Sequence, residues 1–161
     1  MNEMQIANNE RVVRLLHRMW VVDDVLQLNA FTLSDGETYL SVNRPAVESF
    51  NDDVSDFLSK HLQYKTGNNY KCAVINVLDI NQLNILLGAE TASLSVEVEP
   101  RASHYKSHSG IFTRIDGKNI KGGSSKIFET EFGQVVSAGA VLQKVRMHLL
   151  RLSKVEISQL I

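Results

Sequence analysis

The clearest periodic pattern in the chain predicts an amphipathic helix near residues 51–63. Four apolar side chains and one histidine recur there at i, i+3, i+4, i+7 and i+8, a spacing that gathers them on one helix face: Val54, Phe57, Leu58, His61 and Leu62. Ser49 or Asn51 can cap the start of this helix. Acidic residues in its first turns interact favourably with the positive end of the helix dipole.

A second helix is predicted near residues 137–153. Val141, Val145, Leu149 and Leu152 fall on one face at i, i+4, i+8 and i+11. Between the two predicted helices, 80–89 is nearly uncharged but is interrupted by Asn and Gln, so we interpret it as a buried turn.

The patterns typical of strands recur along the chain. In 91–99 apolar Leu94, Val96 and Val98 alternate with polar neighbours, as in a strand with one face in water. The other expected strands are 11–20, whose period also fits a helix, then 38–43, 70–78, 110–115 and 127–132. Strands flanked by helices without regular alternation predict a single α+β domain over 1–161, with a central, mostly antiparallel sheet.

The composition is consistent with this fold, and it excludes several classes of site and cellular location. The 161 residues are 43% hydrophobic and include one cysteine, which excludes an intramolecular disulfide and an all-cysteine zinc site. Residues 1–10 are polar, unlike a secretory signal, and no apolar run reaches the roughly eighteen residues of a membrane span. We therefore expect a cytoplasmic protein with no membrane contact.

Charge is distributed unevenly. Residues 1–100 carry seven Lys and Arg against fourteen Asp and Glu, whereas 101–161 carry ten against four. This asymmetry favours a nucleic-acid or acidic partner for the C-terminal third, unless the two halves fold against each other and cancel.

Two histidines, His104 and His108, lie in a polar segment after the strand at 91–99. Neutral imidazole is both a transition-metal ligand and a general base near neutral pH, so they are candidate catalytic or metal-binding residues. A zinc site would need a third ligand, for which the unranked candidates are Glu97, Glu99, Asp116 and His61. Lys106 between the two rings disfavours a cation, and the pair can also be incidental.

A glycine- and serine-rich run at 122–125, between Lys121 and Lys126, has the ingredients of a phosphate cradle. It lacks the P-loop spacing. We interpret 118–126 as an exposed, mobile loop.

Basic side chains also follow the last helix at i, i+4 and i+7, at Lys144, His148 and Arg151. The residues expected to contact nucleic-acid phosphates are Lys118, Lys121, Lys126, Lys144 and Arg151. The alternative is that the cations on the helix only interact with its negative end.

The residues after the last helix include Val155, Ile157, Leu160 and Ile161, which must dock on the core or meet another subunit. This favours a protein partner or a homo-oligomer. Cys72 lies in an apolar strand, where a thiol is usually inert, and no nucleophile elbow is present.

Three groups of segments form a further pattern: Arg14-Leu-Leu-His-Arg-Met-Trp20; Asn29-Ala-Phe31 with Tyr39-Leu-Ser-Val-Asn-Arg44; and Val98-Glu-Pro100 with His108-Ser-Gly-Ile111. Together they resemble a group of small, mostly uncharacterised bacterial proteins associated with conflict or anti-phage gene clusters. The chain departs from that group at two positions. Glu99 stands where the group has Asp before the proline, and Ser109 stands where the group has Ala after the histidine.

The resemblance implies a genomic setting and draws attention to Ser41, Arg44 and His108, which could converge in one cleft. Arg44 could bind a carboxylate or phosphate through two hydrogen bonds. Alternatively, Ser41 and Arg44 fix the strand end and the turn at Pro45.

We therefore expect a bacterial, non-enzymatic accessory or interaction component that needs no cofactor, and the resemblance implies an anti-phage system as its setting. One alternative is a nucleic-acid-binding module that uses the basic C-terminal third. The other is a metal-dependent nuclease or hydrolase that uses His104 and His108.

Overall fold

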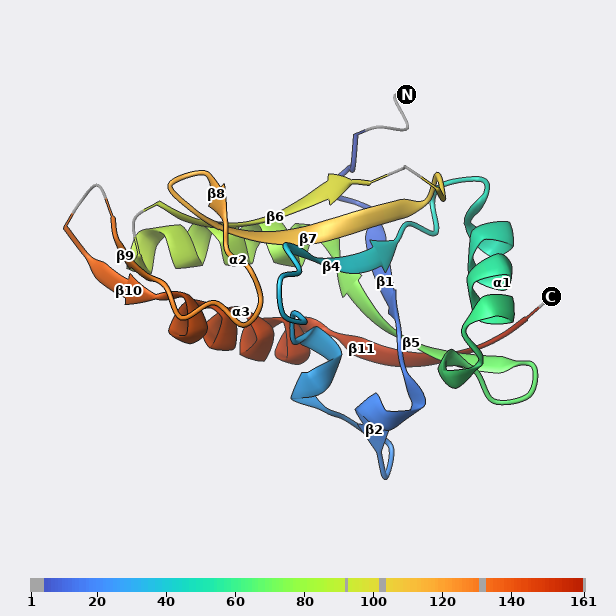
Figure 1. Ribbon diagram of the computed structural model, residues 1–161. Helices are drawn as coiled ribbons and strands as arrows, with labels where there is room; N and C mark the ends of the chain where they lie inside the picture. Colours follow the sequence, from blue (N-terminus) through green and yellow to red (C-terminus); the bar gives the residue numbers. More distant parts are fainter. Residues whose placement is uncertain (1–4, 92, 102–103, 131–132, 161) are drawn as a thin grey trace.

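The computed structural model describes residues 5–91, 93–101, 104–130 and 133–160, and it has the predicted α+β fold (Figure 1). The helices are α1 (Phe50–Lys60), α2 (Val77–Glu90) and α3 (Ala138–Leu152), with short 3-10 turns η1 (Arg18–Trp20), η2 (Leu28–Phe31) and η3 (Leu62–Tyr64). The strands are β1 (Arg11–Leu15), β2 (Val21–Val22), β3 (Val25–Leu26), β4 (Tyr39–Asn43), β5 (Asn69–Asn76), β6 (Leu94–Pro100), β7 (His108–Ile115), β8 (Lys118–Asn119), β9 (Ile127–Glu129), β10 (Val135–Ser137) and β11 (Lys154–Gln159).

The central sheet has the order β11-β5-β1-β4-β7-β6, with β8 added beside β7. All neighbouring strands in it are antiparallel, which confirms the expected sheet. Two small hairpins, β2–β3 and β9–β10, lie outside it. β1 pairs with β5 at five positions but with β4 only at Val13 and Asn43. The sheet therefore opens between β1 and β4, which run in different directions in Figure 1.

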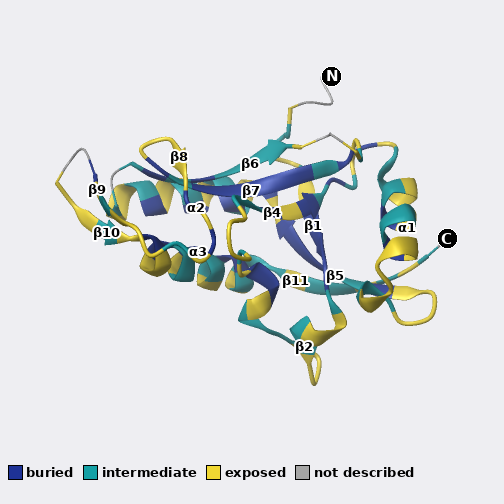
Figure 2. Ribbon diagram, viewed as in Figure 1, coloured by how far each residue is buried: buried dark blue, intermediate teal, exposed yellow. Residues whose placement is uncertain are grey.

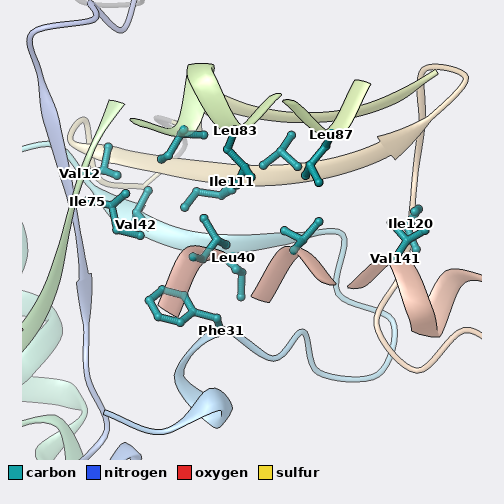
Figure 3. Packing of buried hydrophobic residues seen from close by; sticks show 14 of the residues in the cluster. Val12, Phe31, Leu40, Val42, Ile75, Leu83, Leu87, Ile111, Ile120 and Val141 are labelled. Carbon is teal, nitrogen blue, oxygen red and sulfur yellow. The ribbon is translucent and has the colours of Figure 1, made fainter. Parts of the chain in front are cut away.

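Each face of the sheet has its own apolar cluster. On one face α2 and α3 pack over β1, β5, β4, β7 and β6, and Figure 3 shows Leu83, Leu87 and Ile111 at the centre of this core. On the other face Val54 and Leu58 of α1 pack against Val13, Leu15 and neighbouring residues of β5. β7 is buried along most of its length (Figure 2). The helix α1 covers the β1–β5 half of its face.

Both predicted helices are present, slightly shorter than the pattern indicated. α1 ends at Lys60 because His61 has a non-helical backbone, with φ −131° and ψ 76°. α3 begins after Ser137, whose hydroxyl accepts a hydrogen bond from the Ala140 N–H at 3.2 Å.

The interpretation of 80–89 as a buried turn is wrong, because these residues belong to α2. Ile80, Leu83 and Leu87 face the core, while Leu78, Ile85 and Leu86 are exposed, so the helix has no continuous polar face to reveal its period. One of the interrupting polar residues has a structural role: Asn84 Oδ1 accepts a hydrogen bond from the Val96 N–H of β6 at 2.9 Å.

The strand predictions need smaller corrections. The strand expected over 11–20 ends at Leu15, and η1 follows it. The strand expected from Thr91 begins at Leu94, after Ser93 adopts a left-handed backbone with φ 72°. Of the strand expected at 127–132, Ile127–Glu129 forms the short β9, and residues 131–132 lie outside the described residues. The strand β11 was not anticipated.

The loop over 118–126 is not the fully exposed segment that its composition predicts. Ile120 is 1% exposed and joins the main core. Gly122 is also buried, and its N–H donates to the Glu37 carbonyl at 2.9 Å while its carbonyl accepts from the Gly36 N–H at 2.9 Å. Residues 120–122 are therefore docked against the turn at 34–37.

We predict that Gly122→Ala destabilises the fold. A Cβ at this position would lie 2.2 Å from the Ser34 carbonyl oxygen and 2.7 Å from Leu33 Cβ, so the docked backbone segments must separate. The expected cost is about 1–3 kcal/mol in the free energy of unfolding, measured by urea denaturation.

Gly139→Ala is the matched control, because nothing lies within 4 Å of the added methyl group in the first turn of α3. It should leave stability unchanged or raise it by up to about 1 kcal/mol. Equal stability of the two variants would contradict the docking of this loop.

Candidate functional site

A pocket of about 290 Å³ lies where β1 and β4 separate. Its lining side chains come from β1, η1, β4, α1, η3, the segment before β7 and the first residue of β7: Arg14, Leu15, Trp20, Ser41, Asn43, Phe57, Tyr64, His104, Tyr105 and His108. Three of the four catalytic candidates from the sequence, Ser41, His104 and His108, thus line one pocket.

Arg14 lies at the base of this pocket and is 9% exposed. Its Nε donates to the Ala30 carbonyl, and its Nη1 donates to the Ser41 carbonyl of β4 at 2.9 Å. The guanidinium carbon lies 5.0 Å from the centroid of the Trp20 ring. The side chain therefore bridges the two strands at the point where their backbone pairing stops.

The charge of Arg14 is not neutralised by a contacting carboxylate within the described part of the chain. Burial lowers the pKa of the Arg14 guanidinium to about 10, while Tyr64 and Glu37 act electrostatically in the opposite direction. A pKa of about 10 leaves the group charged at neutral pH. The base of the pocket consequently carries a buried positive charge.

Aromatic rings form a wall of the pocket. Trp20 and Tyr64 meet edge to face with centroids 5.8 Å apart, and Phe57 meets Tyr64 edge to face at 5.2 Å. These residues come from η1, η3 and α1. Such edge-to-face contacts fix the ring orientations, so the aromatic part of the lining is rigid.

The segment 104–108 is held against α1 by two acidic residues. Asp53 Oδ2 accepts hydrogen bonds from the Ser107 N–H at 3.0 Å and the Ser107 hydroxyl at 2.6 Å. Asp56 accepts from the Tyr105 hydroxyl at 2.6 Å, and this bond raises the pKa of Tyr105 to about 12. Asn43 also donates to the Ser107 hydroxyl, at 3.0 Å. The position of the histidines is therefore fixed by side-chain hydrogen bonds.

The two histidines occupy different environments. His108 is partly buried, and its Nδ1 lies 3.1 Å from the Arg101 carbonyl. Burial lowers the pKa of His108 below its ordinary value, so the ring is neutral at neutral pH. His104 is exposed at the pocket rim and contacts Tyr105 edge to face at 4.5 Å.

The aromatic surface continues from the pocket along β4 and β7. The Tyr39 ring lies 6.0 Å from His108 and 5.0 Å from Phe112, and the guanidinium of Arg101 lies 5.2 Å from the Tyr39 centroid. A Cβ on Gly110 would approach the Tyr39 ring to 2.6 Å, so glycine is what lets this ring lie on β7.

Within the described ranges, no group of three His, Cys, Asp or Glu side chains is placed to hold a metal ion. Glu97 and Glu99, two of the candidate third ligands, form ion pairs with Arg114 at 3.7 and 2.5 Å. His61 stacks on Phe57 at 4.4 Å. His104 and His108 therefore gain no third ligand from these residues.

The expectation that Arg44 could bind a ligand bidentately needs correction. Arg44 is 3% exposed, and its Nε and Nη2 each donate to a Glu10 carboxylate oxygen at 2.9 Å. Burial alone would raise the pKa of Glu10, but the hydrogen bond from Arg44 lowers it overall. The bidentate partner is thus internal, and Arg44 does not line the pocket.

The basic candidates separate into two groups. Lys118, Lys121 and Lys126 line one open depression beside β8. Lys144 instead forms an ion pair with Glu90 of α2, and Arg151 interacts with His148 Nδ1 at 3.2 Å.

The apolar residues after α3 form an edge strand. β11 pairs with β5, so Val155 packs against the main core and Leu160 against the smaller cluster, whereas Ile157 remains 67% exposed. Ile161 lies outside the described residues. Cys72 is buried in β5, and burial raises the pKa of its thiol to about 11, which agrees with an inert side chain.

Comparisons with protein-family models, curated proteins and solved structures find no match for this chain. None of the helices in the described part of the chain is long and apolar enough to cross a membrane. The site is therefore interpreted from its own geometry.

The sequence analysis did not identify Arg14, Trp20 and Tyr64 as pocket residues, nor Asp53 and Asp56 as its supports. A signal existed for Arg14, which is a charged residue inside the apolar run 12–16. A cation at a buried position is a functional candidate by itself. The two aspartates had been attributed only to the helix end, and no local pattern links them to Ser107 and Tyr105.

We predict that Asp53→Ala destabilises the protein and loosens 104–108. It removes the charged acceptor of both Ser107 hydrogen bonds, at an expected cost of about 1–3 kcal/mol, and should accelerate amide hydrogen exchange at Ser107. Asp52→Ala removes an exposed acid from the same helical turn, so it controls for the helix-end effect, which is worth about 0.3–1 kcal/mol. Equal exchange at Ser107 in both variants would disprove the anchoring role.

The lowered pKa of His108 predicts a pH dependence of stability. As pH falls below about 6.5, the unfolded chain takes up the proton before the folded protein does, so this residue makes the fold less stable on acidification. His108→Asn should therefore lose less unfolding free energy than wild type between pH 8 and pH 5.5, as measured by urea denaturation. An unchanged or larger loss would show that the histidine is protonated as readily in the folded state.

Proposed function

We propose that this chain is a non-enzymatic accessory component that works by binding a small planar anion in the pocket between β1 and β4. The observation that carries the proposal is the buried Arg14 charge at the base of an aromatic pocket, without a contacting carboxylate in the described residues. A bacterial anti-phage defence system remains the proposed setting, and only the sequence resemblance supports it.

The preference for an anion follows from electrostatics. A charge removed from water is costly unless an opposite charge approaches it, and the interaction strengthens in a low-dielectric environment. Arg14 donates hydrogen bonds to the neutral carbonyl groups of Ala30 and Ser41. An acidic group of a ligand in the pocket would lower the energy of the guanidinium through space, and His104 at the rim could donate a hydrogen bond to it.

The preference for a planar molecule follows from the walls and the size. Trp20, Tyr64 and Phe57 present rings, and the volume of about 290 Å³ lies at the lower limit for small-molecule sites, roughly 300–1,000 Å³. A ligand with one ring system fits this volume. Aromatic faces bind flat rings favourably by stacking or by edge contacts.

Binding is favoured over catalysis because the polar groups in the pocket already have structural partners. The Tyr105 hydroxyl donates to Asp56, Asn43 donates to Ser107, and Arg14 donates to two carbonyls. The neutral His108 ring can still hydrogen-bond a ligand. The metal-dependent alternative is less well supported, since its two histidines have no third ligand among the described side chains.

The experiment uses Trp20, the only tryptophan of the chain, as a reporter at the pocket. Adenosine monophosphate, uridine monophosphate and benzoate are titrated against the protein, with adenosine, uridine and benzamide as uncharged counterparts. We expect a change in tryptophan fluorescence and measurable heat for at least one anion, with weaker binding of its uncharged counterpart.

The variant His104→Ala should weaken this binding by between about twofold and tenfold, the effect of one lost hydrogen bond. His148→Ala, a histidine on α3 outside the pocket, should bind as wild type does. Absence of binding by all three anions, or equal binding of the anions and their uncharged counterparts, would overturn the proposal.

A further inference from the structure

A second concave surface lies around β8 and the segment that follows it, and β8 pairs with β7 beyond the residues that pair with β4. It is an open depression of about 610 Å³ lined by Asp35, Gly36, Lys118, Asn119, Lys121, Gly122, Gly123, Ser124, Lys126 and Phe128. It shares no lining residue with the pocket between β1 and β4. Its occupant is therefore a separate question from the ligand proposed above.

Three ammonium groups dominate the charge of this depression. Lys118, Lys121 and Lys126 are exposed, and no carboxylate in the described part of the chain forms an ion pair with them. One acidic residue, Asp35, also lines the depression. Three cations against one anion leave a net charge of +2 at neutral pH. This contrasts with Lys144, whose charge is paired with Glu90.

The backbone that carries these lysines is held in place before any ligand arrives. Ile120 is buried in the main core, and Gly122 makes hydrogen bonds to Gly36 and Glu37 through both its carbonyl and its N–H. The Ser124 N–H donates to the Lys121 carbonyl at 3.3 Å, and the Ser124 hydroxyl accepts from the Lys126 N–H at 3.2 Å. A fixed concave backbone reduces the ordering cost of binding.

One aromatic ring completes the surface. Lys126 Nζ lies 4.8 Å from the centroid of Phe128, which is partly exposed. Proteins that bind single-stranded nucleic acids combine an aromatic ring with several cations. The phosphates of the strand contact the cations, and a base stacks on the ring.

We propose that this depression binds a run of phosphate groups, supplied by a single-stranded nucleic acid. The depression of about 610 Å³ has room for more than one phosphate group, and a chain of phosphates offers several negative charges to its three lysines. A free oligophosphate offers the same charge pattern without bases. The two sources are distinguished by the test.

The test measures binding of fluorescein-labelled oligouridylate and oligothymidylate by anisotropy over a range of salt concentrations, and binding of inorganic triphosphate by calorimetry. A triple variant combines Lys118→Ala, Lys121→Ala and Lys126→Ala. Its affinity for the oligonucleotide should fall about tenfold or more. The slope of log K against log salt should become shallower by about 2, since each phosphate contact on a single strand contributes about 0.7.

The control variant Lys60→Ala, Lys65→Ala, Lys154→Ala removes the same charge from α1, the end of η3 and β11, outside the depression. It should retain most of the affinity and the salt slope. If both triple variants lose affinity equally, binding depends on net charge alone and the proposal is overturned.

A single substitution sharpens the test. Asp35→Asn removes the one carboxylate in the depression and should strengthen oligonucleotide binding by about two- to fivefold, because a like charge beside the phosphates is lost. Weaker or unchanged binding would place the strand elsewhere and contradict the proposal.

The outcomes separate the sources. Oligonucleotide binding that depends on the three lysines supports a nucleic-acid strand as the occupant. Lysine-dependent binding of triphosphate without oligonucleotide binding supports the phosphate site and assigns it to a free oligophosphate. Absence of binding by both probes at low salt overturns the proposal, whatever the planar-anion titration shows.

Discussion

The architecture around the site depends on how Arg14 joins two strands that do not pair. β1 and β4 share one register position, and beyond it their backbone polar groups need other partners. The guanidinium supplies them by donating to the Ser41 carbonyl on β4 and to the Ala30 carbonyl of η2. The same side chain therefore holds the two halves of the sheet together and brings a positive charge to the space between them.

The rest of the pocket is assembled from segments that are distant in the sequence. The aspartates of α1 orient 104–108, so the helix that packs on the β1–β5 half also positions groups at the start of β7. Asn43 of β4 donates to Ser107, which connects the same segment to the sheet. These bonds join rigid elements, and the ring positions are consequently set by the fold itself.

Local pattern was sufficient for much of the fold and for part of the site. The period of Val54, Phe57 and Leu58 locates α1, and alternation locates β6, because in both elements one face is buried and the other is wet. α2 escaped detection since apolar residues lie on all its sides. His104 and His108 were identified by residue chemistry and Ser41 by the resemblance. The internal partner of Arg44, Glu10, was not anticipated, because tertiary packing alone determines that contact.

The placement of β11 has a consequence for how the protein folds. β5 lies between β1 and β11, and β11 follows α3, so the central strand of this half is flanked by partners from widely separated parts of the sequence. Forming such pairs requires closing long loops before the contacts can stabilise them, which slows folding relative to proteins of similar size with local contacts. Until β11 adds to the sheet, the free edge of β5 is exposed, and partly folded chains in that state can pair with one another through it.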